Sequence, residues 1–366
     1  MTFNLKRETL LKPLQQIIGA VERRQTIPSL GNILFRPEAK GLSLTATDME
    51  IELVAYTDID AEADGDFTLP ARKLFDICRA LPENADMKFN VSAEKGVIQS
   101  GRSRFSLMSL PAADFPVLDE VQAAATFSLA QGRLKSLLER CAFAMAQQDV
   151  RYYLNGLLLE VAGGVLRAVA TDGHRLALCE LGEAVEIEGD QQVIIPRKGV
   201  LELQRLLEDS DEPAKVELSA NHIRVELADL RFTSKLIDGR FPDYNRVLPK
   251  DSDKLMSVEK DTLRHALTRA SILSNEKYRG IRLMLEQGAL KIQAHNPEHE
   301  EAEEEIEVDF NGEPVEIGFN VNYLLDALGA VAHSRINMEL KDGNSSALIK
   351  SPESGEALYV VMPMRL

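Results

Sequence analysis

Apolar residues recur every three or four positions in six short stretches of the chain, and this spacing predicts six helices. In the first, Leu10, Leu14 and Ile17 line one face of a helix expected over about residues 7–18. The other five are expected over about 72–80, 132–146, 198–207, 261–273 and 321–332. Between them, alternating apolar runs predict short strands, most of them three in succession. A strand, a helix and three strands form the recurring unit, which predicts an α+β fold with helices on one face of antiparallel sheets.

This pattern is periodic. The stretch 170–178, which begins Ala-Thr-Asp, has counterparts at 46–54 and 294–302, spaced 124 residues apart in both directions. Two further landmarks keep the same order, at 68–75, 194–201 and 318–325 and again at 104–107, 231–234 and 358–361. Repeats of fixed period indicate tandem structural units. We therefore expect three domains of one fold, each a doubled unit, over residues 1–118, 126–244 and 245–366.

The N-terminus, the apolar runs and the cysteines indicate the cellular environment that we expect for this chain. The N-terminus lacks the apolar core of a signal peptide, and no apolar run approaches the length of a membrane span, so we expect a soluble cytoplasmic protein. Cys78, Cys141 and Cys179 are isolated and have no metal-ligand spacing. We expect buried thiols, no metal and no cofactor.

Charge is distributed unevenly. The chain carries −16, yet five of the six predicted helices each carry +2 and the sixth −1, which leaves −25 for the remainder. Helices that line one surface would attract nucleic-acid phosphate to that side alone. The alternative is that Lys and Arg simply favour solvated helix faces. Because no recognition helix, zinc finger or aromatic platform is present, we expect contact with the nucleic-acid backbone and no base readout.

Six stretches carry a family resemblance: 100–107, 148–156, 170–176, 238–244, 272–277 and 359–366. They resemble the β sliding clamp family of bacterial DNA polymerase III, and the likeness spans the whole chain. It implies a head-to-tail homodimer whose six domains form a ring around duplex DNA. Such a clamp tethers replicative and other DNA polymerases and repair proteins through short linear peptides, is opened by an ATP-driven clamp loader, and performs no chemistry itself.

The resemblance also implies residue roles. For DNA binding it points to Arg24, Arg72, Lys73, Gln148, Arg151, Tyr152, Tyr153, Arg197 and Lys198. For a groove that binds partner peptides it points to Leu154, Thr171, Gly173, His174, Arg175, Leu176, Pro242, Arg246, Val247, Ser346, Val360, Val361, Met362, Pro363, Met364, Arg365 and Leu366. For the dimer interface it points to Lys73, Arg102, Arg104, Phe105, Leu107, Ile272, Leu273, Glu298, Glu300, Glu303 and Glu304.

Two of these sets also have a rationale in the residues. Arg102 and Arg104 make the end of the first repeat basic, and the third repeat carries a run of glutamates from Glu298 onward, which favours head-to-tail contact. Residues 362–366 form an apolar tail to which the repeat alignment assigns no structural duty. We therefore expect it to serve binding.

Two alternatives remain. Asp149, Asp172 and His174 could form a metal or acid–base site, as in a nuclease, but the equivalent positions in the other repeats do not preserve the set. No phosphate-binding loop or nucleophile motif is present. The second alternative is a repeat scaffold that binds proteins through its sheets without forming a ring.

Overall fold

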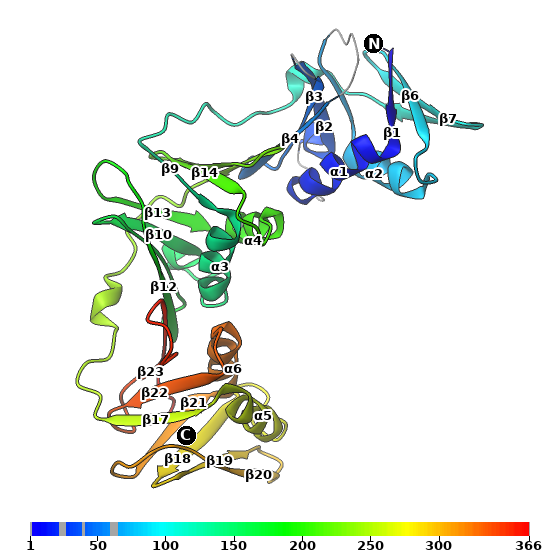
Figure 1. Cartoon of the computed structure of the whole chain (residues 1–366). Coiled ribbons are helices and arrows are strands. Elements are labelled where there is room, and N and C mark those ends of the chain that lie inside the picture. Colours follow the sequence, from blue (N-terminus) through cyan, green and yellow to red (C-terminus); the bar gives the residue numbers. More distant parts are fainter. Residues whose placement is uncertain (1, 22–26, 39–40, 59–64, 366) are drawn as a thin grey trace. The chain divides into compact units, whose positions relative to one another are not determined.

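The structure, a computed structural model, describes residues 2–21, 27–38, 41–58 and 65–365 (Figure 1). The chain divides into two compact units, one made of Met1–Gly132 with Leu201–Leu236 and the other of Arg133–Val200 with Ile237–Leu366. The division falls within the two helices of the central repeat. Each unit therefore holds one terminal repeat and half of the central one.

The first unit contains a four-stranded and an eight-stranded sheet, both antiparallel. The smaller has the order β1 (Thr2–Lys6), β6 (Asp86–Val91), β7 (Lys95–Ser100) and β8 (Ser103–Met108). The larger has the order β5 (Phe67–Pro70), β2 (Asn32–Glu38), β3 (Gly41–Thr47), β4 (Ile51–Thr57), β16 (Leu230–Lys235), β15 (His222–Glu226), β14 (Pro213–Leu218) and β9 (Ala125–Ala130). Helices α1 (Arg7–Ile17) and α2 (Ala71–Ala80) pack against each other in this unit.

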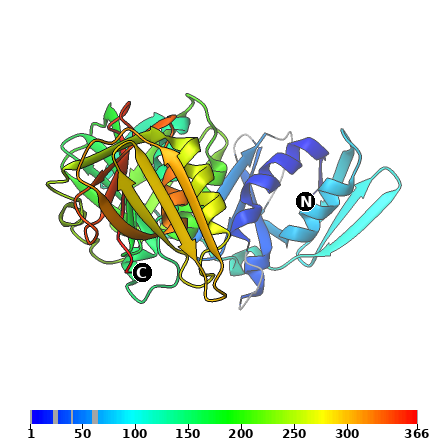
Figure 2. The same ribbon diagram turned by 90° about the horizontal axis from the view of Figure 1, so that it is seen from below.

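The second unit repeats this design. Its larger sheet has the order β13 (Gln191–Pro196), β10 (Gly156–Ala162), β11 (Val165–Thr171), β12 (Arg175–Ala184), β24 (Ala357–Val361), β23 (Ala347–Lys350), β22 (Arg335–Leu340) and β17 (Lys254–Glu259). Its smaller sheet has the order β20 (Glu301–Glu307), β19 (Ala289–His295), β18 (Gly280–Glu286) and β21 (Val315–Asn320). Helices α5 (Lys260–Ser271) and α6 (Val321–Ala330) lie beside the smaller sheet (Figure 2), and α3 (Gln131–Ala142) and α4 (Arg197–Leu206) cross the division between the units.

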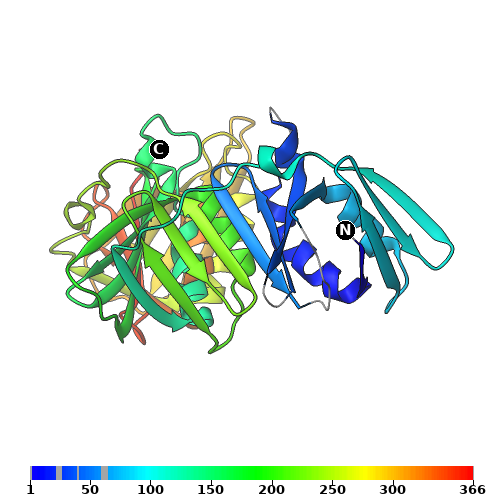
Figure 3. The same cartoon turned by 90° about the horizontal axis from the view of Figure 1, so that it is seen from above.

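Each eight-stranded sheet joins strands of two neighbouring repeats. In the first unit β4 pairs with β16, and Phe232 lies opposite Leu53; Figure 3 shows these blue and green strands side by side. In the second unit β12 pairs with β24, and Tyr359 lies opposite Ala177. The two four-stranded sheets each keep one such strand, β8 or β20, at an edge. An unpaired edge presents free backbone donors and acceptors.

The Ala-Thr-Asp stretch that marks the repeat is a β-turn with a fixed set of hydrogen bonds. Thr171 Oγ1 donates to the carbonyl of Arg175 at 2.6 Å, and Asp172 Oδ1 accepts from the backbone N–H groups of His174 and Arg175. The turn at Thr47 and Asp48 makes the same bonds. The repeated motif is therefore explained by turn chemistry, because Asp and Thr side chains satisfy backbone groups that leave the ladder.

The predicted fold class is confirmed: antiparallel sheets, helices packed against them, and repeated strand–helix–meander units. The buried core is largely aliphatic, and within it Phe3 stacks on Phe89 at 4.8 Å and Phe35 on Phe67 at 4.7 Å. The third helix ends at Ala142, four residues before the prediction, where the chain tightens into bonds from Ala144 and Met145 to carbonyls three residues back. Within the described ranges no helix combines the length and apolarity that a membrane span requires.

Candidate functional site

An apolar cluster covers one face of the eight-stranded sheet in the second unit. Its buried members come from six strands and from the segment that follows Ile237: Leu158, Val169, Leu176, Leu178, Ile194, Phe241, Tyr244, Leu348 and Val360. Tyr153, Ile237, Val247, Leu248 and Leu358 pack against it and are only partly buried. Leu154 is buried nearby, and Met362 is 36% exposed beside the last strand. Partly exposed apolar residues around a buried floor are what a surface for an apolar ligand requires.

Arg175 fixes one side of this face. Its guanidinium donates to Asp172 at 3.1 Å and to the carbonyl of Phe143 at 2.9 Å, and it also bonds Asp326. It lies over the Tyr323 ring at 4.6 Å, and His174 stacks on the same ring. All three guanidinium nitrogens of Arg175 thus have a hydrogen-bond partner, and the side chain links β12 to α6.

A loop before β10 covers the neighbouring turn. Arg151 donates to both carboxylate oxygens of Asp149, at 3.0 and 2.8 Å, and to the carbonyl of Asp172 at 3.2 Å. The hydrogen bond from Arg151 is the main reason that the pKa of Asp149 falls to about 2. The guanidinium lies over Gly173, where an added Cβ would come within 3.0 Å of it. The loop is thus held on the turn, and the absence of a side chain at Gly173 lets the guanidinium approach closely.

The C-terminal tail has a structural role that the sequence prediction denied. Met362 N donates to the carbonyl of His174 at 2.9 Å, and Met364 N donates to the carbonyl of Gly318 at 2.8 Å. The second bond has a counterpart in the central repeat, where Ile237 N donates to the carbonyl of Ile194 at 2.9 Å. The tail is therefore the third copy of the segment that elsewhere becomes an interdomain linker, and the expectation of no structural duty is wrong.

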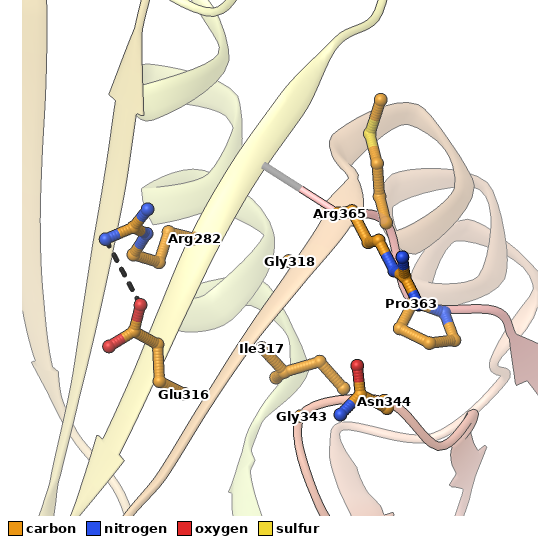
Figure 4. A pocket seen from close by; sticks show the side chains of 9 residues that line it. Arg282, Glu316, Ile317, Gly318, Gly343, Asn344, Pro363 and Arg365 are labelled. Atoms are coloured by element: carbon orange, nitrogen blue, oxygen red, sulfur yellow. Dashed lines mark ion pairs between the residues drawn. The ribbon is translucent and has the colours of Figure 1, made fainter.

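A cavity of about 530 Å³ opens where the tail meets β21 (Figure 4). Arg282 and Glu316 form an ion pair of 3.1 Å on one side, and Pro363 and Arg365 face them across the opening. Asn344 and Gly343 line the cavity on the side of Pro363. Ser346, Val361, Pro242 and Arg246 belong to the same unit, so this unit contains every groove residue that the sequence predicted, apart from Leu366, which lies outside the described residues.

The residues predicted to contact DNA are distributed over both units. Arg72 and Lys73 are exposed at the start of α2, and Arg197 and Lys198 begin α4, where Arg197 donates to the carbonyl of Met145. Gln148, Arg151, Tyr152 and Tyr153 share the loop before β10, where Tyr152 is 57% exposed. Arg24 lies outside the described residues.

Several helical cations hold structural contacts. Arg133 and Arg140 both bind Glu356, and Arg205 binds Glu202 and the carbonyls that end α1. The helices therefore present less free positive charge than the sequence count suggests.

Apart from Lys73, the residues predicted at the dimer interface lie on or next to the two edge strands. Phe105 is half-buried and Leu107 buried on β8, while Arg102 and Arg104 are exposed. Ile272 is 73% exposed after α5, and Leu273 is half-buried. On β20 Glu303 points outward, but Glu304 binds Arg269 at 2.7 and 2.8 Å within its own unit. Lys73 lies on α2, and Glu298 and Glu300 lie in the turn before β20, where Asn296 donates to Glu300.

The nuclease alternative finds no support in this geometry. Asp172 is committed to its turn and to Arg175, and Asp149 is committed to Arg151. Across the part of the chain that the structure describes, no three His, Cys, Asp or Glu side chains gather as metal ligands.

Sequence reasoning missed Tyr244, a buried member of the cluster, and Phe143 and Tyr323, whose rings lie against the Arg175 guanidinium. Tyr244 had a signal, since it follows the Phe-Pro pair at the end of the second repeat. The other two aromatic residues had none.

Comparison with known proteins gives one consistent result. Residues 1–119, 128–243 and 245–365 match models of the N-terminal, central and C-terminal domains of the DNA polymerase III beta subunit. The beta sliding clamps of Pseudomonas aeruginosa and Escherichia coli K12 are 54% and 52% identical over 367 residues, with 100% of both chains covered.

Solved structures agree. A crystal structure of the DNA polymerase III subunit beta from Pseudomonas aeruginosa superimposes with a TM-score of 0.98 at 53% identity, and a clamp of that organism bound to griselimycin with 0.96 at 54%. Caulobacter crescentus pol III beta gives 0.93 at 40%, and all three comparisons cover 100% of both chains.

Proposed function

This chain belongs to the DNA polymerase III beta subunit family, the β sliding clamps, and from that membership we propose that two copies close into a ring around duplex DNA. Like the family, it is a processivity factor and not an enzyme. In the proposed function the ring tethers the replicative polymerase, other polymerases and repair proteins, and a clamp loader places it on DNA. We assign it to the bacterial cytoplasm, where the chromosome is replicated.

The unpaired edges β8 and β20 carry the proposal. The last strand of the central repeat, β16, pairs with β4 of the first, and the last strand of the third repeat, β24, pairs with β12 of the central one. By the same rule β8, the last strand of the first repeat, requires β20 of a third repeat. A second copy supplies that strand, and contact between two different surfaces closes when the rotation allows it.

The repeat also fixes the register of the proposed contact. Leu53 pairs with Ala46, Ala177 with Ala170 and Ala302 with Ala294, so Leu53, Ala177 and Ala302 are equivalent. Their partners across the repeat junctions are Phe232 and Tyr359.

Phe105 is the equivalent of those two partners and would face Ala302 of the second copy. One step along the antiparallel ladder, Arg104 would face Glu303. Both side chains are exposed in the single chain, and opposite charges at paired positions stabilise a ladder. The exposed Ile272 and the half-buried Leu273 would supply apolar area beside it.

The helices are the surface we propose for DNA, with Arg72, Lys73, Arg197 and Lys198 at helix starts and the loop 148–153 as contacts. Arg24 belongs to the same proposal by its resemblance. Contacts of this kind neutralise phosphate without reading sequence. Because several other helical cations are already paired, topology would hold the ring on DNA more than charge does.

The apolar face of the second unit is the groove we propose for partner peptides. Leu176, Val247 and Val360 belong to its apolar cluster, and the turn at Thr171 to Arg175 supplies polar hydrogen-bonding groups beside it. An extended peptide needs such a combination. Leu154, buried in the preceding loop, belongs to the proposed groove by the family resemblance. Substituting Met364 by Ala is a cleaner test than deleting residues 362–366, since deletion also removes two backbone bonds that hold β12 and β21 to the tail.

Retention on DNA tests the whole proposal. The protein is loaded by a cognate loader with ATP onto nicked circular duplex, washed with high salt, and the circle is then cut. A ring survives the salt and leaves after linearisation. A protein held by charge alone loses affinity steeply with salt on both topologies, and that result would favour the open scaffold. Native mass separates the two as well, because the ring requires a dimer.

A further inference from the structure

A row of polar side chains crosses the groove sheet next to its apolar rows. Gln192, Glu160, Arg167 and Glu180 lie opposite one another on β13, β10, β11 and β12. Two residues along each strand, the same face carries Ile194, Leu158, Val169 and Leu178, which belong to the apolar cluster. The sheet thus changes from polar to apolar in a single step at the border of the groove.

Tyr244 lies across this border. Its ring is a buried member of the apolar cluster, and its hydroxyl donates to Glu160 Oε2 at 2.6 Å. Arg167 bonds the same carboxylate oxygen and donates to the Tyr244 hydroxyl at 3.0 Å. Since Glu160 is only 6% exposed, water is not available to replace these partners.

The network holds one cation, Arg167, between two carboxylates. Gln192 donates to the second oxygen of Glu160, and Arg167 also binds Glu180 at 2.6 Å. Hydrogen bonds from Tyr244, Gln192 and Arg167 outweigh the opposing effect of burial and lower the pKa of Glu160, while burial and the bond to Glu160 raise that of Tyr244 to about 12. Glu160 is therefore ionised and Tyr244 protonated throughout the physiological pH range.

Tyr244 begins the short 3-10 helix Tyr244–Arg246, which carries one wall of the proposed groove. Val247 N donates to the carbonyl of Tyr244 at 3.0 Å, and Arg246 N donates to that of Asp243. Pro242, Arg246 and Val247, the three groove residues in this segment, lie within three positions of the tyrosine. A bond that fixes the Tyr244 hydroxyl therefore also restrains the neighbouring groove residues of this segment.

The first interdomain linker is held differently. Its Phe115-Pro116 pair aligns with Phe241-Pro242, so Leu118 takes the place of Tyr244. There a backbone N–H, that of Leu118, donates at 3.0 Å to Glu52, which occupies the position equivalent to the groove residue Leu176. A buried carboxylate therefore stands where the second unit has apolar floor, and the tyrosine bond is specific to the linker that borders the groove.

We propose that Tyr244 and Glu160 are positioning residues for partner binding: their hydrogen bond fixes the linker wall on the sheet and so sets the width of the peptide groove. This inference rests on the proposed peptide groove. A wall held in place before binding spares the ligand the cost of ordering it, and preorganisation of this kind raises affinity mainly by slowing dissociation.

The test measures binding of a fluorescent peptide that carries the clamp-binding segment of the cognate replicative polymerase, well below the unfolding midpoint of each variant. Tyr244→Phe removes only the hydroxyl. We expect its dissociation constant to rise at least about fivefold, which corresponds to about 1 kcal/mol, chiefly through a faster off-rate. Tyr56→Phe is the matched control, because Tyr56 is 40% exposed on β4 of the other unit, and it should bind like the wild type.

Glu160→Gln and Glu160→Leu complete the design. Glutamine retains an acceptor for the tyrosine and should recover most of the affinity, whereas leucine should weaken binding as Tyr244→Phe does. Combined with Tyr244→Phe, the leucine variant should bind no more weakly than the weaker single variant, because both remove one interaction. A role in stability alone would lower the unfolding midpoint and leave the affinity of folded protein unchanged.

Val247→Glu puts a charge into the proposed groove. This variant distinguishes failure of the groove from failure of the positioning role of Tyr244 and Glu160. If it abolishes binding while Tyr244→Phe binds within twofold of the wild type, the positioning role is wrong and the groove stands. If wild-type protein does not bind the peptide, or Val247→Glu binds normally, the groove fails and the positioning role fails with it.

Discussion

The two equivalent turns should respond in opposite ways to exchange between glycine and a residue with a side chain, as measured by the stability of the protein. Met49 and Gly173 occupy the same position in turns with the same hydrogen bonds, and both adopt a left-handed backbone, with φ of 75° and 87°. For a residue with a side chain this conformation costs about 1–2 kcal/mol, whereas glycine adopts it freely. The first turn therefore stores strain that the second does not.

Met49→Gly should stabilise the protein. Glycine removes the strain but adds about 0.5–1 kcal/mol of unfolded-state entropy, so the net gain should be about 0.5–1 kcal/mol. Gly173→Ala should do the reverse by at least about 1 kcal/mol, because it introduces the left-handed strain. Its Cβ would also lie 3.0 Å from the Arg151 guanidinium, which must then shift by a few tenths of an ångström.

Urea unfolding followed by circular dichroism measures both changes, as a shift in midpoint at constant slope. Gly65→Ala is a control for left-handed strain alone, since its φ is 86° and nothing lies within 4 Å of the added Cβ. Gly173→Ala should therefore destabilise more than Gly65→Ala. A lower midpoint for Met49→Gly, or an unchanged one for Gly173→Ala, would refute the strain argument.

Three further outcomes are expected. Ile272→Ala combined with Leu273→Ala should give folded monomer by native mass spectrometry, and a dimer of unchanged mass would contradict the proposed interface. Arg104→Glu should weaken the dimer in sedimentation by placing like charges opposite each other, and Glu303→Arg in the same chain should restore it; no rescue would mean that the register is wrong. The pKa of Asp149 is depressed from 3.8 to about 2, so the stabilising contribution of its bond to arginine should be complete above pH 3.8 and lost only as pH falls through about 2. Loss of the arginine side-chain NMR signature of that bond near pH 5 would contradict this.

The repeat in the sequence predicted much of the architecture. The spacing of 124 residues indicated three copies of one unit, and the periodicity of short apolar runs indicated helices on antiparallel sheets. Such local signals are reliable because hydrophobic period and turn chemistry act over a few residues. The repeated Ala-Thr-Asp stretch illustrates this, since each of its conserved bonds lies within five residues.

Contacts between distant residues could not be read in the same way. Tyr244 and Glu160 are 84 positions apart, and only the folded sheet shows that the Glu160 carboxylate accepts a hydrogen bond from the Tyr244 hydroxyl. The tail was misjudged for a related reason, because its bond to Gly318 involves backbone atoms that no residue type reveals. Counting charges on helices had the same weakness, since Arg133 and Arg140 are both paired with Glu356, which lies more than 200 residues away in the sequence.

The glutamates of β20 have a consequence for how single chains behave in solution. Glu301, Glu303, Glu305 and Glu307 are all exposed along this edge. If two β20 strands met each other, as exposed edges in concentrated protein tend to do, these like charges would be packed together, with Lys291, 3.9 Å from Glu305, as a nearby basic side chain. The charge on β20 would thus disfavour its pairing with a second β20 strand, which protects against aggregation, and would favour its pairing with a basic edge such as β8. Neutralising these side chains should allow β20 strands to pair with each other and so promote self-association of single chains.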